Sequence, residues 1–195
     1  MKKRDFLCSL LAAAPWPVWA KRPAATSVRS APAILTVTGA IARTNRPGFD
    51  KVFDVLMGKH GVAFDRAYAF DYAMVARLPV TTISATLEYD GQKHALSGPL
   101  LTDVLQAAGA TPSDSTRLSL RAVDGYAPQM TLADARRFGF IVATHRDAKP
   151  LALGGLGPLW AVYAADRFAD MMAKPLSQRF ATCPWGLYHI DVARA

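Results

Sequence analysis

Cysteine is scarce in this chain of 195 residues, which contains only Cys8 and Cys183. Cys8 falls in an N-terminal segment that we expect to be removed, so Cys183 is the only thiol of the mature chain. One thiol excludes an internal disulfide and a zinc site built from cysteines. Histidine is also sparse, and the four histidines lie far apart without a second histidine at helical spacing: His60, His94, His145 and His189. No metal site made by the protein alone is therefore predicted.

Several sequence signatures of common activities are missing. The glycine-bearing stretch Leu151–Pro158, LALGGLGP, has neither the GxGxxG spacing nor a Walker lysine, so it does not predict a nucleotide site. No serine stands in a nucleophile elbow, which leaves hydrolase chemistry unsupported. Lysine and arginine are dispersed, without a basic tract interleaved with aromatic residues, so nucleic-acid binding is not expected. With 51% hydrophobic and 19% charged residues, the composition is that of a globular domain.

The first 20 residues read as a secretory signal peptide. Three basic residues precede an apolar stretch, and Val18-Trp19-Ala20 ends it with a small residue. Removing this segment lowers the net charge from +8 to +6, and nothing that follows is apolar enough to span a membrane. The protein is predicted to be periplasmic or secreted. Lys3-Arg4-Asp5-Phe6-Leu7 resembles a twin-arginine signal with lysine in the first position, so both general secretion and twin-arginine export remain open.

Residues 21–32 are rich in Ala, Pro, Arg and Ser, which predicts a flexible arm before a domain that spans 33–195. The domain opens on a strand, Ala33–Ile41. Apolar residues then recur at helical spacing from Phe49 to Met57, and this pattern predicts an amphipathic helix that ends near Gly58. A second short helix, capped by Asp71, is expected to end at Pro79.

The stretch Gly98–Tyr126 carries the most consistent local signals. Pro99 is expected in the first turn of a helix whose apolar stripe ends before Gly109. The strand RLSLRAV follows, with leucines and Ala122 alternating with polar residues, and it runs into the tight turn Asp124-Gly125. Before this stretch, Val80–Tyr89 and Gln92–Leu96 flank Asp90-Gly91, which predicts a β-hairpin.

Strands are predicted to dominate the rest of the chain as well. Extended segments are expected at Phe140–Thr144, Leu159–Ala164 and Trp185–Val192, with weak helical character at Asp170–Phe180. Helices are few and short and do not alternate regularly with the strands. The fold class predicted is therefore α+β rather than a doubly wound parallel sheet.

The order of these pieces resembles the molybdopterin-binding domain of the sulfite-oxidase fold. The resemblance covers most of residues 80–193. It is carried by the hairpin and by short segments: Gly98–Leu105, Ala122–Tyr126, Pro150-Leu151, Gly157-Pro158-Leu159, Val162-Tyr163 and Trp185–Val192. It implies a mixed, β-rich, barrel-like core with short helices. In catalytic members it also implies a pterin-bound molybdenum centre in a cleft, ligated by a cysteine near the start of the domain. The corresponding stretch here, Ile83–Tyr89, contains no cysteine.

Two groups of polar residues at strand ends are candidates for ligand binding. Arg121, Asp124 and Tyr126 surround the turn after the predicted strand, where a guanidinium and a phenol suit a carboxylate, phosphate or sulfate. The alternative is an Arg121–Asp124 contact that only fixes the turn. His145 and Arg146 follow another strand and precede the glycine loop, and the alternative for them is an ordinary surface turn.

These features predict an exported, molybdopterin-oxidoreductase-like domain that binds a small anionic ligand or a periplasmic or membrane protein partner, without autonomous molybdenum catalysis. No cofactor is expected on this reading. The alternative is a periplasmic oxidoreductase that holds molybdopterin without a cysteine ligand, in which case the cofactor is molybdopterin.

Overall fold

The computed structural model describes residues 31–193. The predicted signal peptide, residues 1–20, and nearly all of the predicted arm lie outside the described residues. The first strand, predicted over Ala33–Ile41, is present and covers Ala33–Gly39.

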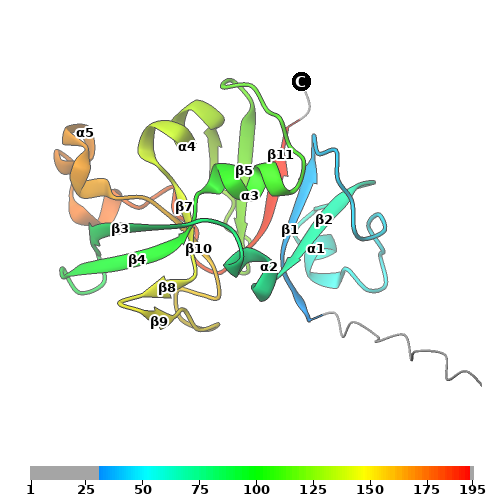
Figure 1. Ribbon diagram of the computed structural model, residues 1–195, viewed down its shortest axis with the longest axis horizontal. Coiled ribbons are helices and arrows are strands. Elements are labelled where there is room, and N and C mark those ends of the chain that lie inside the picture. Colours follow the sequence, from blue (N-terminus) through cyan, green and yellow to red (C-terminus); the bar gives the residue numbers. More distant parts are fainter. Residues whose placement is uncertain (1–30, 194–195) are drawn as a thin grey trace, which may run out of the picture.

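The largest sheet has five strands in the order β2-β1-β11-β5-β6. Its strands are β1 (Ala33–Gly39), β2 (Ala67–Asp71), β5 (Arg117–Ala122), β6 (Gln129–Thr131) and β11 (Leu187–Val192). β1 and β11 run parallel, whereas the other neighbours are antiparallel. The first and last strands of the domain are therefore adjacent at the centre of this sheet (Figure 1).

A second sheet has the order β3-β4-β8-β9, and β7 pairs with β10 between the two larger sheets. The strands are β3 (Val80–Thr86), β4 (Lys93–Pro99), β7 (Ile141–Ala143), β8 (His145–Arg146), β9 (Lys149–Pro150) and β10 (Trp160–Val162). The predicted hairpin is confirmed as β3–β4, with Thr86 opposite Lys93. Pro99 is the last residue of β4 and pairs with Val80, so its predicted place in a helical turn is wrong.

The helices are all short. They are α1 (Val55–Lys59), α2 (Tyr72–Ala76), α3 (Leu101–Ala107), α4 (Leu132–Phe138) and α5 (Ala169–Met172), with 3-10 turns η1 (Ala165–Arg167) and η2 (Leu176–Gln178). The cap predicted at Asp71 is confirmed, because its Oδ1 accepts from the Met74 amide at 2.7 Å. α4 begins with a capping box between Thr131 and Asp134.

The amphipathic helix predicted from Phe49 to Met57 is mostly absent. α1 covers five residues, and Val52 and Phe53 are 71% and 85% exposed. Asp50 explains the difference, because its Oδ1 accepts from the amides of Val52 and Phe53 and holds this stretch in turns. Local side-chain bonds of this kind compete with helix formation.

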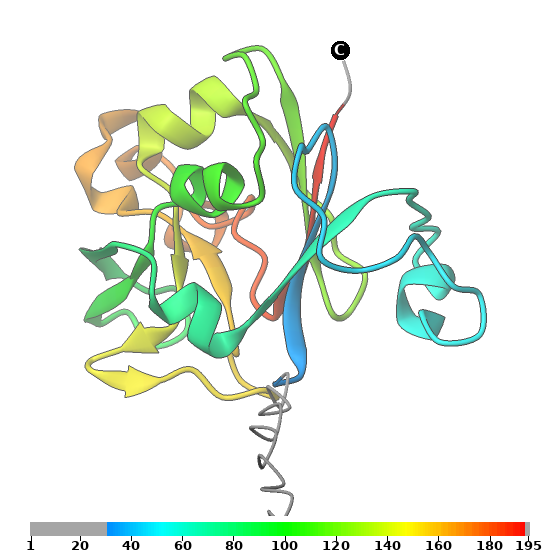
Figure 2. The same ribbon diagram turned by 45° about the vertical axis from the view of Figure 1, so that its right-hand side comes forward.

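The core lies between the five-stranded sheet and the other two sheets, with α3 and α4 packed on the same side. Figure 2 shows α1 and its loop on the opposite face of the five-stranded sheet. The alternation predicted for β5 is confirmed, since Leu118, Leu120 and Ala122 are buried. The fold is mixed α+β and β-rich with short helices. The barrel-like core that the resemblance implied is not observed, because within residues 31–193 the sheets do not close into a barrel. No helix in this part of the chain is long and apolar enough to cross a membrane.

Candidate functional site

Arg121 lies on the face of β5 opposite Ala122, because successive side chains of a strand alternate. Its Nη1 donates to the Gly125 carbonyl at 3.3 Å, so the guanidinium braces the turn after β5. The contact is with the backbone of the turn and not with the carboxylate of Asp124 that the sequence suggested. The Nε of Arg121 is buried without a hydrogen-bond partner among the described residues.

A buried polar cluster lies beside Arg121 on this outer face. His189 stands opposite Arg121 across β11 and β5 and is 3% exposed. Its Nε2 lies 2.9 Å from the Thr38 Oγ1, while its Nδ1 is buried and has no partner in the described part of the chain. Burial lowers the pKa of His189 to about 4, with a further lowering from Arg121 and an opposing influence from the Asp191 carboxylate. His189 is therefore neutral at physiological pH.

Asp124 and Tyr126 form the tight turn that the sequence predicted. Asp124 Oδ1 accepts from the Tyr126 amide at 2.9 Å, and Gly125 has a φ of +93° that favours glycine. The Tyr126 hydroxyl donates to the Ala181 carbonyl. That bond joins the turn to a segment 55 residues further along the chain.

A small cavity opens at this turn, and we call it the turn pocket. Its volume is about 210 Å³, and its walls come from the end of the β3–β4 hairpin, the β5 turn and the segment before β11. The lining residues are Glu88, Tyr89, Ala122, Asp124, Tyr126, Phe180, Ala181, Cys183, Pro184 and Trp185. The turn pocket thus contains two of the five predicted site residues. It also contains the end of the stretch in which the resemblance places a cysteine.

His145 and Arg146 lie elsewhere, in β8 of the four-stranded sheet. The His145 Nδ1 is 2.8 Å from the Thr144 Oγ1, and the exposed Arg146 lies 3.9 Å from Asp147. Neither residue lines the turn pocket. The five residues predicted to hold one anion are therefore distributed over three places: the turn pocket, the outer face of β5 and the β8–β9 hairpin.

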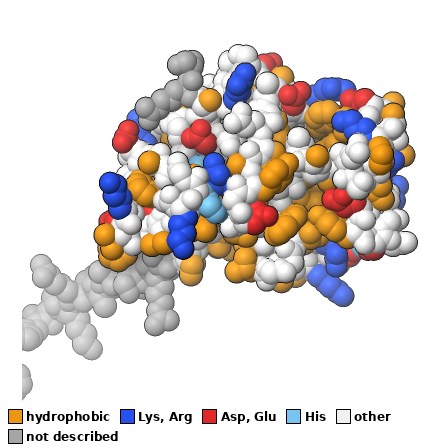
Figure 3. Space-filling model, turned by 180° about the vertical axis from the view of Figure 1, so that it is seen from behind, with side chains coloured by type: hydrophobic (Ala, Val, Ile, Leu, Met, Phe, Trp, Pro, Cys, Tyr) orange, Lys and Arg blue, Asp and Glu red, His pale blue; other side chains and the backbone are white. Residues whose placement is uncertain are grey.

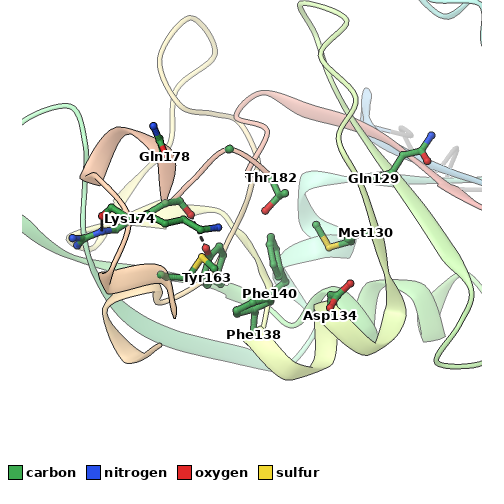
Figure 4. Close-up of a pocket in the computed structure, with 12 residues that line it drawn as sticks. Gln129, Met130, Asp134, Phe138, Phe140, Tyr163, Lys174, Gln178 and Thr182 are labelled. Atoms are coloured by element: carbon green, nitrogen blue, oxygen red, sulfur yellow. Dashed lines mark hydrogen bonds between the residues drawn. The ribbon is translucent and has the colours of Figure 1, made fainter. Parts of the chain in front are cut away.

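A second cavity, which we call the aromatic pocket, has a volume of about 230 Å³. Phe138 and Phe140 approach Tyr163 with ring centroids 5.0 and 4.9 Å away. Figure 4 shows these rings at the base of the pocket, with polar residues on its flanks. The full lining is Gln129, Met130, Asp134, Phe138, Phe140, Tyr163, Met171, Lys174, Gln178, Arg179, Ala181 and Thr182. Tyr163 also belongs to the hydrophobic core and is 2% exposed.

The three charged side chains of the aromatic pocket differ in whether they already have hydrogen-bond partners. Asp134 is occupied by the capping box, with its Oδ2 accepting from the Thr131 hydroxyl at 2.6 Å. Arg179 donates to the Lys174 and Met172 carbonyls, which fixes the segment between α5 and η2. The ammonium of Lys174 makes no hydrogen bond or ion pair with the residues that the structure describes. Lys174 is thus the cation that remains available to a ligand.

The residues of the turn pocket do not fit a thiolate-ligated molybdenum cofactor. Cys183 is 5% exposed, and burial raises the pKa of its thiol well above the usual range, so it stays protonated. Tyr89 ends the stretch that lacks a cysteine. Its side chain is 56% exposed, and the partial burial that remains, together with Glu88, raises the pKa of its phenol to about 12. None of the described lining residues is a lysine or arginine that would bind a phosphate.

Size and ligand chemistry lead to the same conclusion. The volume of the turn pocket lies below the roughly 300–1,000 Å³ of sites that enclose larger ligands. Across residues 31–193, no group of three or more His, Cys, Asp or Glu side chains is placed to hold a metal ion. Molybdenum favours soft thiolate sulfur, and the groups present at the pocket are carboxylates, phenols and a protonated thiol.

Comparison with known proteins finds a similarity of fold and no match in sequence. No family model matches the chain, and no curated protein matches it. Among solved structures, the sulfane dehydrogenase SoxCD from Paracoccus pantotrophus aligns with a TM-score of 0.54 at 12% identity, over 82% of this chain and 37% of that one. The chain therefore corresponds to little more than a third of the length of that relative. At this identity the likeness concerns the fold alone, and it agrees with the mixed α+β, β-rich class predicted from the sequence.

Proposed function

We propose that this chain is an exported ligand-binding domain that holds a small organic anion with an apolar ring in the aromatic pocket, without autonomous molybdenum catalysis. The observation that carries the proposal is the combination of an aromatic base with one free ammonium at its rim. Buried aromatic walls supply most of the attraction for an apolar ring, and one polar group fixes its orientation.

The contacts around the pocket favour a preformed site. The Tyr163 hydroxyl donates to the Arg179 carbonyl at 2.5 Å, so the base of the pocket is tied to its flank. Phe138 packs on Phe168 as well as on Tyr163, which limits rotation of its ring. A ligand therefore meets side chains that are already ordered, and it loses little free energy in arranging them.

The anionic group is assigned from the charges on the rim. Asp134 already accepts from the hydroxyl and, at 3.3 Å, the amide of Thr131, so its charge is stabilised within α4. Lys174 has no such partner in the described chain. A carboxylate that enters the pocket would form a charge-assisted contact with Lys174 without displacing an existing ion pair.

Matched probes test the proposal by isothermal titration calorimetry. Phenylacetate and phenylacetamide share a ring and differ in charge, so we expect phenylacetate to bind about fivefold more tightly, corresponding to about 1 kcal/mol. Lys174→Gln should remove that preference. Lys149→Gln, which changes an exposed lysine in β9, serves as the control and should keep it. Equal binding of the two probes by the wild type would refute the proposal.

Export remains part of the proposal. It is supported by the signal-like sequence of residues 1–20 and by the twin-arginine-like Lys3–Leu7. The cofactor-free domain and the molybdopterin-dependent enzyme can be distinguished by analysis for metal and pterin. The protein is purified for this from the periplasm or medium of its native host. We expect neither molybdenum nor pterin. Stoichiometric amounts of both would instead favour the alternative, a molybdopterin-dependent oxidoreductase without a cysteine ligand. Co-purification with a membrane protein would indicate the protein partner considered above.

A further inference from the structure

We infer that the turn pocket binds a small organic ammonium ion, held between aromatic faces and two carboxylates. This site is separate from the aromatic pocket, with which it shares only Ala181. The inference does not depend on the function proposed above. It rests on the chemistry of the residues that line the turn pocket and on the bonds that hold them in place.

Three aromatic side chains of this pocket are unusually exposed. Tyr89, Tyr126 and Trp185 are 56%, 51% and 38% exposed, although each is large enough to gain from burial. None of the three packs its ring against another aromatic ring in the described chain. Part of each side chain is therefore accessible to a ligand, and aromatic faces attract cations through the negative potential above the ring.

The charge of the pocket has the sign that a cation requires. Glu88 and Asp124 belong to its lining, and no lysine or arginine does so among the described residues. This is distinctive in a chain with an excess of eight basic charges. On the face opposite that of Figure 1, basic and acidic side chains are interspersed around apolar ones (Figure 3). Two carboxylates in a lining that holds no lysine or arginine among the described residues, next to partly exposed aromatic rings, favour an ammonium ion over an anion or a neutral molecule.

Hydrogen bonds fix the walls of the pocket relative to one another. On one side, the Val123 amide donates to the Gly186 carbonyl at 3.0 Å, and Tyr126 is bonded to Ala181. On the other side, the indole Nε1 of Trp160 donates to the Cys183 carbonyl at 3.0 Å. The segment that carries Trp185 is therefore held between β5 and β10. The carboxylate of Asp124 is oriented by its bond to the Tyr126 amide.

The first experiment uses a chain without residues 1–20 and two probes of the same shape. Choline carries a quaternary ammonium, and 3,3-dimethylbutan-1-ol replaces that nitrogen with carbon. Titration is followed by calorimetry and by tryptophan emission, which reports on the half-exposed Trp185. We expect choline to bind at least fivefold more tightly than the alcohol. Equal affinity for the two probes would overturn the inference on the wild-type protein alone.

Variants then locate the bound cation. Glu88→Gln combined with Asp124→Asn removes both charges, and the Asn oxygen can still accept from the Tyr126 amide. We expect this double variant to lose the preference for choline, while Asp114→Asn, which removes one charge outside the pocket, keeps it. Trp185→Leu should weaken choline binding by severalfold. Circular dichroism confirms that each variant is folded. Wild-type affinity in the folded double variant would refute the assignment to this pocket.

Discussion

His189 should make the protein less stable in acid, because the folded protein offers no hydrogen-bond acceptor for a second proton on its imidazole ring. The Thr38 hydroxyl donates to the Asp191 Oδ1 at 2.9 Å, so the Thr38 oxygen accepts from the His189 Nε2. The remaining ring nitrogen, Nδ1, is buried and has no acceptor among the described residues. Protonation would place an unpaired N–H and a positive charge there, on the strand beside Arg121.

The size of the effect follows from the difference between two pKa values. The pKa of His189 is about 4 in the folded protein and about 6.5 in an unfolded chain. Between these values the unfolded state binds more protons, so the free energy of unfolding falls as the pH falls through 6.5 towards 4. At about 1.4 kcal/mol per pH unit, His189 should remove ~3 kcal/mol between pH 7 and pH 4.

Urea unfolding of the wild type and of His189→Gln, at pH values between 4 and 7, measures how much His189 contributes to the pH dependence of the free energy of unfolding. Glutamine can meet the Thr38 hydroxyl and does not titrate, so the variant should lose ~3 kcal/mol less stability between pH 7 and pH 4. His94 acts in the opposite direction, because hydrogen bonds to Asp147 and Asp90 raise its pKa. Its stabilising contribution is lost as the pH rises through that raised pKa, and it cancels because both proteins contain it. Parallel pH profiles would refute the reasoning.

Two further predictions concern the thiol and the contact between β4 and β7. In a chain without residues 1–20, Cys183 should resist a thiol-specific disulfide reagent at pH 7 until the protein is unfolded, because it is buried and protonated; rapid labelling of folded protein would contradict this. Gly98→Ala should cost ~2 kcal/mol or more, since its Cβ would lie 2.0 Å from the Val142 carbonyl oxygen. Gly155→Ala, whose Cβ has ordinary contacts, should change the urea midpoint little, and equal effects of the two substitutions would refute the argument.

The parts of the fold that the sequence predicted are those governed by neighbouring residues. The turn Asp90-Gly91 joins β3 to β4, and alternation along β5 reports which side chains face the core. Gly109 adopts a φ of +76° just after α3, as a helix-ending glycine should. The failure at Phe49–Met57 has the same origin, because periodicity alone does not reveal that Asp50 uses its carboxylate to bind nearby amides.

The candidate sites were harder to predict because their walls come from distant parts of the chain. Asp124 and Tyr126 could be placed at a turn, but their neighbours at Ala181 and Trp185 are fixed only by the return of the chain before β11. The alternation of β5 did predict one feature of the site correctly. Arg121 and Ala122 are successive residues of a strand, so their side chains must lie on opposite faces of the sheet.

Because of this alternation, the Arg121 guanidinium does not reach the turn pocket that Tyr126 lines. Each of the two places therefore suits a different ligand from the one predicted. Arg121 lies on the outer face beside His189, with its Nε buried, whereas Tyr126 lines a pocket whose charged side chains are carboxylates. The free cation of Lys174 lies at the aromatic pocket, which shares only Ala181 with the turn pocket. An anion expected beside Tyr126 is therefore better placed beside Lys174, and a cation suits the turn pocket, because each ligand then meets the opposite charge without breaking an existing ion pair.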